Sequence, residues 1–342
     1  MCTTQPIGEL DFQLKSQATN KENLTKRARA KFLSERLCQN LYDYACQVDS
    51  PLKRTYANSL RCCSKIIIKN GKTVSQYCKN RCCLVCSRIK CAYDINNYKD
   101  SYEEKMQNPN FLTLTIRNVE GRFLRHTAKE MLKTWDKIRD SYRKEFDPKI
   151  YPVIGFLKTE CTHNEVENTF HPHFHFTGEG DHFCKYAMTK WLKHSKSNGF
   201  NKAEHWCQKL KKLEFEYDKD GKRNYKELQE TFKYIAKTTS GEQSSTSIDI
   251  VALDTIFCAL SHIRCLRFYG LKKKKATQEE IEAIECEEAP ESVEELEVFV
   301  WKTNNWFSTD SGEALTDFVP NEKELNFEKM IEKGKLLRQK LM

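Results

Sequence analysis

The chain has 342 residues, of which 39% are hydrophobic and 31% are charged. This length and balance describe a globular protein in water with room for more than one module. Its longest apolar runs, at 250–253 and 256–260, are far shorter than the ~20 residues that a membrane-spanning helix needs. The N-terminal stretch MCTTQPIGELDFQLK lacks the basic and then apolar order of a signal peptide. We therefore expect a cytoplasmic protein without a membrane partner.

The charge is divided unevenly along the chain. Residues 1–275 contain 50 Lys and Arg against 31 Asp and Glu, a net charge of +19, whereas residues 276–342 carry 7 against 17, a net charge of −10. A long basic body favours a polyanionic partner, although an ordinary solvated surface is the alternative. Ten glutamates between 279 and 297, without a Lys or Arg, predict a disordered or loosely helical linker.

In chain order, residues 1–55 are polar and basic and predict a helical N-terminal segment, and residues 56–100 hold a cysteine-rich module. FLTLTIRN (111–118) alternates and is β-branched, which predicts a strand. Apolar residues then recur at helical spacing and predict the core-facing stripe of a long helix: Leu124, Ala128, Met131, Leu132, Trp135, Ile138 and Tyr142.

Two further strands are predicted at 151–163 and 169–178, joined by the polar turn NEVEN. A helix at 183–194, a strand and turn at 213–222, and a helix at 227–237 follow. This mixture, without regular βαβ alternation, predicts an α+β domain over 101–275, with helices around a central antiparallel sheet. Residues 276–342 are predicted to form an acidic C-terminal tail.

The second of the paired strands contains HPHFHF, with His171, His173 and His175 at alternate positions. Side chains alternate between the faces of a strand, so the three imidazoles share one face. Neighbouring histidines can share a metal ion, but the outer pair, about 13 Å apart, cannot. The hairpin at NEVEN brings Glu160 beside them as a third ligand. A single buried histidine is usually a core residue, but three beside a carboxylate favour a metal site, and a zinc hydrolase with these ligands is one alternative.

A second group of candidate residues lies on the helix predicted at 227–237. Glu230, Tyr234 and Lys237 are spaced i, i+4 and i+7 and share one helical face. Tyr225 lies nine residues before Tyr234, on the opposite face. On their own, such pairs are usually amphipathic surface.

Seven cysteines lie between residues 62 and 91. Cys83 and Cys86 form a C-x-x-C pair, which lets two thiolates bind one tetrahedral zinc ion. Cys78 and one of Cys62 or Cys63 complete four ligands, and we take Cys62 as the fourth. A structural zinc site is the favoured interpretation, and a redox role for the C-x-x-C pair is the alternative.

Together these motifs resemble, in order and spacing, the rolling-circle replication initiators of small bacterial plasmids. These are HUH endonucleases, and the single-tyrosine group of small staphylococcal-type plasmids is the most similar. The resemblance rests on FLTLTIRN, a Glu followed by HPHFHF, E-x-x-x-Y-x-x-K, and RCLRFYGLKK at 264–273 as a closing strand. CKNRCCLVC resembles that group's C-x-x-R-x-C-P-x-C stretch, with Leu84 in place of Pro and an additional Cys82. The similarity covers roughly residues 60–275.

The resemblance implies that His173, His175 and Glu160 bind a catalytic Mg²⁺ or Mn²⁺ ion. It also implies that Tyr234 attacks the scissile phosphate, with Lys237 beside it and Glu230 serving termination. His171 would then support the site or contact DNA.

The expected function is therefore site-specific nicking and strand transfer at a plasmid replication origin. It would use single-stranded and duplex DNA and a 5′-phosphotyrosine intermediate, with host helicase and polymerase as further partners. A rolling-circle transposase of the HUH type and a zinc-containing DNA-binding repressor are the alternatives.

Overall fold

The computed structural model describes residues 7–69, 72–197, 203–217, 219, 223–224, 247–274 and 297–341. The chain divides into two compact units, one formed by 1–87 with 277–332 and the other by 88–276 with 333–342. In the described part, no helix is both long and apolar enough to cross a bilayer.

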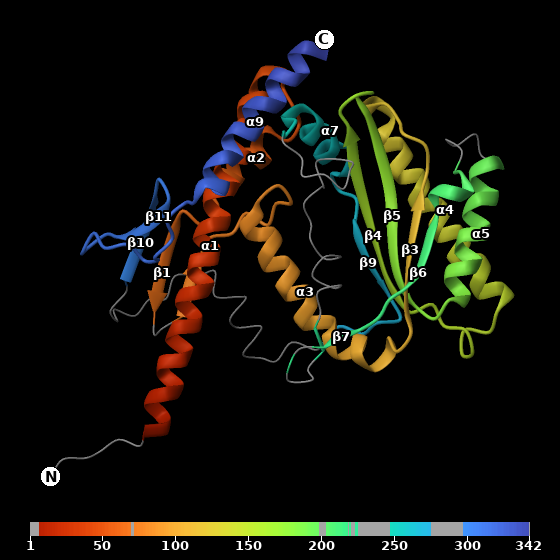
Figure 1. Cartoon of the computed structure of the whole chain (residues 1–342), viewed down its shortest axis with the longest axis horizontal. Helices are drawn as coiled ribbons and strands as arrows, with labels where there is room; N and C mark the ends of the chain where they lie inside the picture. The colour runs from red at the N-terminus through yellow and green to blue at the C-terminus, as the bar shows by residue number, and fades with distance from the viewer. Residues whose placement is uncertain are drawn as a thin grey trace. The chain divides into compact units, whose positions relative to one another are not determined.

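The second unit is built on a five-stranded antiparallel sheet with the order β6-β3-β5-β4-β9 (Figure 1). Its strands are β3 (Pro109–Thr115), β4 (Gly155–Asn164), β5 (Thr169–Glu179), β6 (Lys209–Lys212) and β9 (Leu266–Tyr269). The strands predicted from FLTLTIRN, from the NEVEN hairpin and from RCLRFYGLKK are confirmed as β3, β4, β5 and β9. The α+β class with an antiparallel sheet between helices is confirmed as well.

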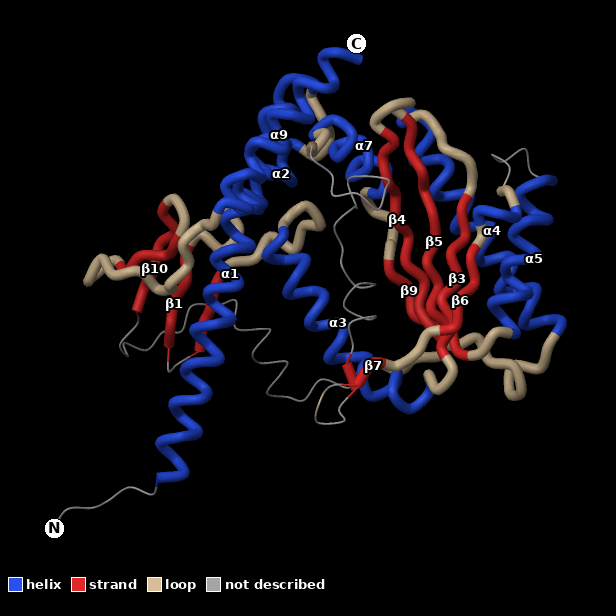
Figure 2. The backbone as a smooth tube through the Cα atoms, in the orientation of Figure 1, coloured by secondary structure: helices blue, strands red, loops and turns tan. Residues whose placement is uncertain are grey.

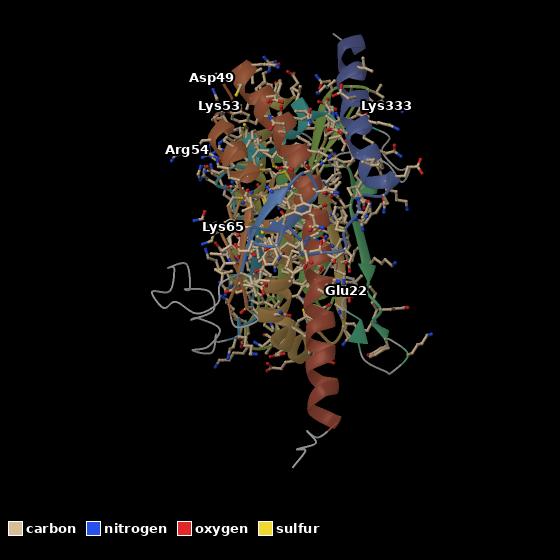
Figure 3. The ribbon with its side chains drawn as sticks, turned by 90° about the vertical axis from the view of Figure 1, so that its left-hand side faces the viewer. Glu22, Asp49, Lys53, Arg54, Lys65 and Lys333 are labelled. Carbon is tan, nitrogen blue, oxygen red and sulfur yellow. The ribbon has the colours of Figure 1, made fainter. Side chains whose placement is uncertain are left out.

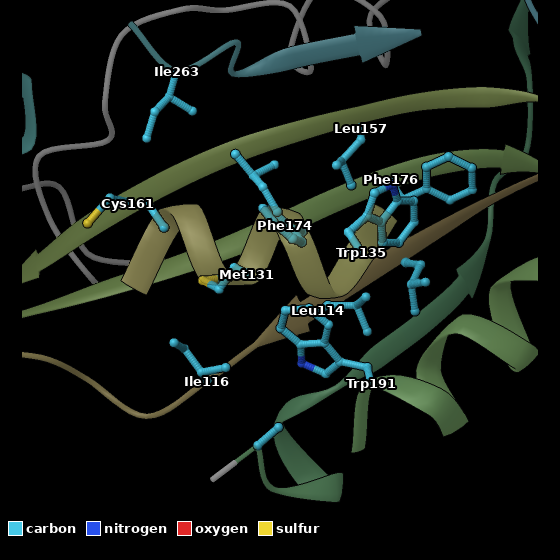
Figure 4. Packing of buried hydrophobic residues seen from close by; sticks show 14 of the residues in the cluster. Leu114, Ile116, Met131, Trp135, Leu157, Cys161, Phe174, Phe176, Trp191 and Ile263 are labelled. Carbon is cyan, nitrogen blue, oxygen red and sulfur yellow. The ribbon is translucent and has the colours of Figure 1, made fainter. Parts of the chain in front are cut away.

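Three helices pack on the apolar face of this sheet: α4 (Gly121–Glu145), α5 (His182–Ser197) and α7 (Ile250–Leu260). The apolar stripe predicted for 124–142 is confirmed, because all of its residues are buried on α4. Trp135 is central, with its ring 5.1 Å from that of Phe176 and 5.6 Å from that of Phe183. Figure 4 shows Trp135 among Phe174 and Phe176 of β5, with Trp191 of α5 nearby.

Part of the opposite face is covered by α3 (Leu84–Lys105), which Figure 2 shows on the other side of the sheet from α4 and α5. Tyr102 packs with Phe156 and Leu266, and the ring of Tyr98 stacks on that of Phe268 with 3.7 Å between centroids. The short elements η1 (His205–Cys207), β7 (Glu216–Tyr217) and β8 (Arg223–Asn224) complete this unit.

The first unit contains a four-stranded antiparallel sheet with the order β11-β10-β1-β2. Its strands are β1 (Lys65–Lys69), β2 (Lys72–Ser75), β10 (Glu297–Lys302) and β11 (Asn305–Ser308), and its helices are α1 (Ile7–Val48), α2 (Lys53–Leu60) and most of α9 (Glu322–Leu341). Exposed cations include Lys53 and Arg54 of α2 and Lys65 of β1, which Figure 3 labels along the left-hand edge of the view.

Two boundaries differ from those predicted. Phe32 of the predicted N-terminal segment packs in one core with Cys62 and Cys83 of the cysteine-rich module. The predicted acidic tail contains β10 and β11, and β10 pairs with β1 from Lys65↔Val300 to Ile68↔Glu297. A tail separate from the folded modules therefore does not describe residues 297–308. The glutamate-rich linker predicted at 279–297 lies almost wholly outside the described residues.

Candidate functional site

The three histidines of β5 lie on the sheet face opposite the Trp135 core. Antiparallel pairing places Glu160 of β4 directly across from His173, and Thr113 of β3 directly across from His175. Phe174 and Phe176, which alternate with the histidines, face the core and are buried. The period of two in HPHFHF thus separates an apolar face from a face that carries nitrogen ligands.

A carboxylate and two imidazoles converge on this face. Oε2 of Glu160 lies 3.3 Å from Nε2 of His173 and 3.3 Å from Nε2 of His175. One ligand atom from each residue fits within a span of 4.8 Å. His171 is not part of this group: its Nδ1 contacts Oδ1 of Asn118 at 2.9 Å, and burial lowers its pKa to about 4.

The hydrogen bonds behind the two imidazoles determine which nitrogen faces the carboxylate. Nδ1 of His173 lies 3.0 Å from the backbone carbonyl of His171, and a carbonyl only accepts, so this nitrogen carries a proton. Nδ1 of His175 lies 3.1 Å from the Thr113 hydroxyl. A neutral His173 ring therefore presents its Nε2 lone pair to a cation beside Glu160, the arrangement of metal-binding histidines held by a second hydrogen bond, whereas the Thr113 hydroxyl can donate to or accept from His175. The Glu160 carboxylate and the two Nε2 atoms lie close enough to bind one divalent cation.

Lys158 is a member of this site that the sequence analysis did not single out. It lies two residues before Glu160 on β4, across from His175, and its ammonium forms an ion pair with Oε1 of Glu160. Burial raises the pKa of the Glu160 carboxyl, but the two imidazoles and the charge of Lys158 outweigh it and hold this pKa well below its usual range. Burial lowers the pKa of His175. The site therefore combines an ionised carboxylate with a neutral imidazole at neutral pH. The K-x-E spacing was the signal that could have revealed Lys158.

Gln208 and Trp191 fix the end of β3 beside His173. The Gln208 side chain accepts from the backbone N–H of Thr115 at 2.8 Å and donates to its carbonyl at 3.2 Å. The Trp191 indole also donates to that carbonyl, at 3.0 Å. Because Thr115 is the register partner of His173, these bonds stabilise the strand next to the candidate ligands.

The predicted catalytic helix, with Glu230, Tyr234 and Lys237, lies outside the described residues, and so does the alternative nucleophile Tyr225. These roles stay predictions.

In the first unit, Cys62, Cys78, Cys83 and Cys86 bring four sulfur atoms within 4.8 Å of one another. The Sγ atom of Cys86 lies 3.5 Å from that of Cys62 and 3.7 Å from that of Cys78. Zn–S bonds of about 2.3 Å in a tetrahedron require sulfur atoms about 3.8 Å apart, so this cluster fits zinc. The backbone N–H of Lys79 also donates to Sγ of Cys86, at 3.2 Å.

The neighbouring cysteines have other surroundings. Sγ of Cys82 lies 3.3 Å from the Ser59 hydroxyl, and Cys91 packs beside the Tyr102 cluster. Cys63 is buried outside the group of four. The structure therefore brings together the four cysteines that we took as ligands and leaves the alternative Cys63 out.

Hydrogen bonding between the thiols favours ionisation of part of this cluster. A hydrogen bond from Cys62 lowers the pKa of Cys83 to about 7 and holds that of Cys78 far below its usual range. The thiolate is the form of cysteine that binds metal, so the cluster is prepared for a cation near neutral pH.

Comparison with known proteins places these two sites in a family. A family model described as "Replication protein" (Rep_1) matches residues 72–310. The chain belongs to this family of replication proteins. The matched range contains three of the four clustered cysteines, β3–β5 with Glu160, His173 and His175, and the predicted Tyr234 helix.

Three curated relatives, each named "Protein rep", agree with this family. One from Streptococcus pneumoniae is 32% identical over 132 residues, which are 34% of this chain and 38% of the relative. One from a Bacillus species and one from Bacillus amyloliquefaciens are each 36% identical over 111 residues, which are 30% of this chain and 33% and 30% of the relatives. The matched segments thus span about a third of the relatives' lengths. No solved structure matches the chain.

Proposed function

We propose that this replication protein starts rolling-circle replication of a plasmid in the bacterial cytoplasm. It would cut one DNA strand at the origin and leave a 3′-OH end for a host polymerase, with a host helicase opening the duplex. The observation that carries this proposal is the convergence of Glu160, His173 and His175 in a member of a replication protein family. The E-x-x-x-Y-x-x-K pattern, which resembles the single-tyrosine HUH initiators, supports it.

Glu160, His173 and His175 would hold a Mg²⁺ or Mn²⁺ ion. Such an ion supplies Lewis-acid polarisation of a non-bridging phosphate oxygen. Imidazole ligands favour Mn²⁺ over Mg²⁺ on chemical grounds, whereas carboxylate and phosphate oxygens suit both ions. Lys158 would keep Glu160 ionised, and Thr113 would hold the His175 ring in position.

Tyr234 would be the nucleophile. Its phenolic oxygen forms a bond to phosphorus while the bond from phosphorus to the 3′ oxygen breaks, and the departing oxygen takes up a proton to become the 3′-OH primer. The 5′ end stays on Tyr234 as a phosphodiester, which preserves the bond for later rejoining. A free phenol has a pKa near 10, so it needs assistance at neutral pH. Lys237, one helical turn away, would provide it by steadying the phenolate or the phosphate.

The first unit would hold a structural Zn²⁺ ion through Cys62, Cys78, Cys83 and Cys86. This ion would fix the segment between α2 and α3, and the exposed Lys53, Arg54 and Lys65 would contact the phosphates of duplex DNA at the origin.

The test is incubation of the full chain with single-stranded DNA spanning its own origin, with and without added Mn²⁺. We expect metal-dependent cleavage that His173→Ala and His175→Ala abolish and that His171→Ala reduces less. Cleavage at an undiminished rate in His173→Ala would contradict the assigned ligands. DNA binding by the wild-type chain without any cleavage would favour the repressor, and cleavage at transposon ends would favour the transposase.

A further inference from the structure

The edge of the five-stranded sheet next to the metal-ligand face carries an exposed aromatic ring and two cations. Trp206 lies in η1, immediately before the edge strand β6, and its side chain is 79% exposed. Trp135, Trp191 and Trp306 are all buried, and Trp301 is half-buried, so Trp206 differs from the other four tryptophans of the chain. A single exposed apolar residue is common on protein surfaces, so Trp206 indicates a contact surface only together with the two cations that lie beside it in the chain.

The register of β6 places two of its lysines on the metal-ligand face. Lys209 lies across from Thr113, and Lys211 across from Phe111, while Leu210 between them packs against the core. Thr113 is in turn the partner of His175, so Lys209, Thr113 and His175 form one row across three strands. Neighbouring strands are about 4.8 Å apart, which puts the backbone of Lys209 about 10 Å from that of His175.

Strand β3, which lies between β6 and β5, supplies a second aromatic ring. The ring of Phe111 stacks on that of His175, with 4.9 Å between centroids and an interplanar angle of 23°. Trp206 itself comes two residues before Gln208, which bonds to the backbone of Thr115 at the level of His173. Within the described residues, neither Lys209 nor Lys211 has a carboxylate partner, and the nearby Glu204 pairs with Arg117.

We propose that η1 and β6 (205–212) form a surface that binds single-stranded DNA and leads to the metal ligands. Trp206 stacks on a base, and Lys209 and Lys211 contact successive phosphates. This proposal rests on the proposed function, because it supplies the path by which a DNA strand reaches Glu160, His173 and His175. Lysines on an edge strand can also serve only to prevent sheet-to-sheet association. The exposed Trp206 beside them favours nucleic acid, because aromatic rings and cations in alternation are the usual means of gripping a single strand.

The test measures binding alone, without added Mg²⁺ or Mn²⁺, so it does not depend on cleavage. The probe is a fluorescein-labelled oligothymidylate of about 12 nucleotides, within the usual range of single-strand sites. Anisotropy gives its affinity for the full chain with its zinc. We expect Trp206→Ala to weaken binding about 5- to 150-fold and Trp206→Phe to retain most of it. Phe123→Ala, which removes a 48% exposed ring from α4, is the matched control and should bind as the wild type does.

The lysines are tested by salt dependence. Each phosphate contact to a single strand contributes about 0.7 to the slope of log affinity against log salt concentration. The double variant Lys209→Ala, Lys211→Ala should therefore lower this slope by about 1.4, while the control Lys129→Ala on α4 should leave it unchanged. Oligothymidylate should also quench tryptophan emission in the wild-type chain, and this quenching should be lost in Trp206→Phe.

Unchanged affinity in Trp206→Ala together with an unchanged slope in the lysine variant would overturn the proposal, even if the wild-type chain cuts DNA. An equal loss of affinity for a duplex of the same length would also overturn it, because the surface would then not be specific for a single strand. If these variants lose binding while the wild-type chain cuts no DNA, the surface stands and the proposed function fails. A normal circular dichroism spectrum for each variant separates lost contacts from lost folding.

Discussion

Lys158 and Glu160 share one face of β4, and their ion pair divides the two oxygens of the Glu160 carboxylate between different partners. Oε1 pairs with the Lys158 ammonium, while Oε2 lies 3.3 Å from the Nε2 atoms of both His173 and His175. Because the pair is buried, it is little screened by water. The two imidazoles and Lys158 together keep the carboxylate ionised, and its Oε2 side is available to a cation.

Lys158→Met should therefore change the pH dependence of metal binding. In this variant only the two imidazoles counteract the rise that burial causes in the pKa of Glu160, so this pKa is higher than in the wild type. Protons then compete with the metal ion for the carboxylate at higher pH. We expect the acid limb, the pH range in which Mn²⁺ affinity falls on acidification, to move to higher pH when affinity is measured by calorimetry. At pH 8, where the carboxylate is ionised in both proteins, affinity should be equal or higher, since a positive charge has been removed. Lys133→Met on α4 is the control, and an acid limb that stays in place would exclude this role for Lys158.

The cysteine assignment predicts different zinc contents for two neighbouring substitutions. Cys86→Ser removes a sulfur of the four-membered cluster, whereas Cys82→Ser changes a thiol that contacts Ser59 outside it. We expect about one zinc ion per chain in the wild type and in Cys82→Ser, and a large loss in Cys86→Ser, by elemental mass spectrometry. Loss of zinc from Cys82→Ser with full retention in Cys86→Ser would require another ligand set.

The β10–β11 hairpin should be needed for the stability of the unit that contains the four clustered cysteines. Trp306 of β11 is fully buried, and its indole N–H donates to the backbone carbonyl of Cys63, next to Cys62, at 2.8 Å. Trp306→Ala should lower the free energy of unfolding of this unit by about 3–5 kcal/mol, measured by urea denaturation. Trp206→Ala, at an exposed position, serves as control and should change it by less than about 0.5 kcal/mol. Equal effects of the two substitutions would show that the hairpin is not part of this core.

Glu230 is predicted to act when replication ends. It lies four residues before Tyr234, which is one turn of the predicted helix, and a carboxylate there can serve as general base for a water molecule in the closing cleavage. Glu230→Ala should still nick DNA and form the Tyr234 adduct but should release multimeric single strands in place of unit-length circles, as seen on a denaturing gel. A surface charge paired with a lysine would leave unit-length products unchanged.

The sequence predicted the sheet around the candidate site because its signals are local. Alternation in HPHFHF and the NEVEN turn define β4, β5 and their register, which places Glu160 across from His173. The choice of Cys62 over Cys63 had no such signal, since adjacent residues differ only in the direction of their side chains. The structure separates them by burying Cys63 outside the cluster.

Long-range pairing accounts for most of what the sequence analysis missed. β10 pairs with β1 across more than two hundred residues, and the acidic composition before it suggested a tail instead. Gln208 and β6 were missed for a similar reason, because KLKK has no apolar alternation and forms a strand only against β3. Lys158 lies two residues before Glu160 and so shares its face of β4, but it was missed because a lysine in a strand ordinarily faces water.

The most direct test of the proposed function is to locate the covalent bond between protein and DNA. The full chain is incubated with Mn²⁺ and single-stranded origin DNA, denatured and digested, and the DNA-linked peptide is sequenced by mass spectrometry. We predict a 5′-phosphate on Tyr234, an adduct that Tyr234→Phe abolishes and Tyr225→Phe retains. DNA cleaved without a protein-linked 5′ end, or an adduct of normal yield in Tyr234→Phe, would contradict the account.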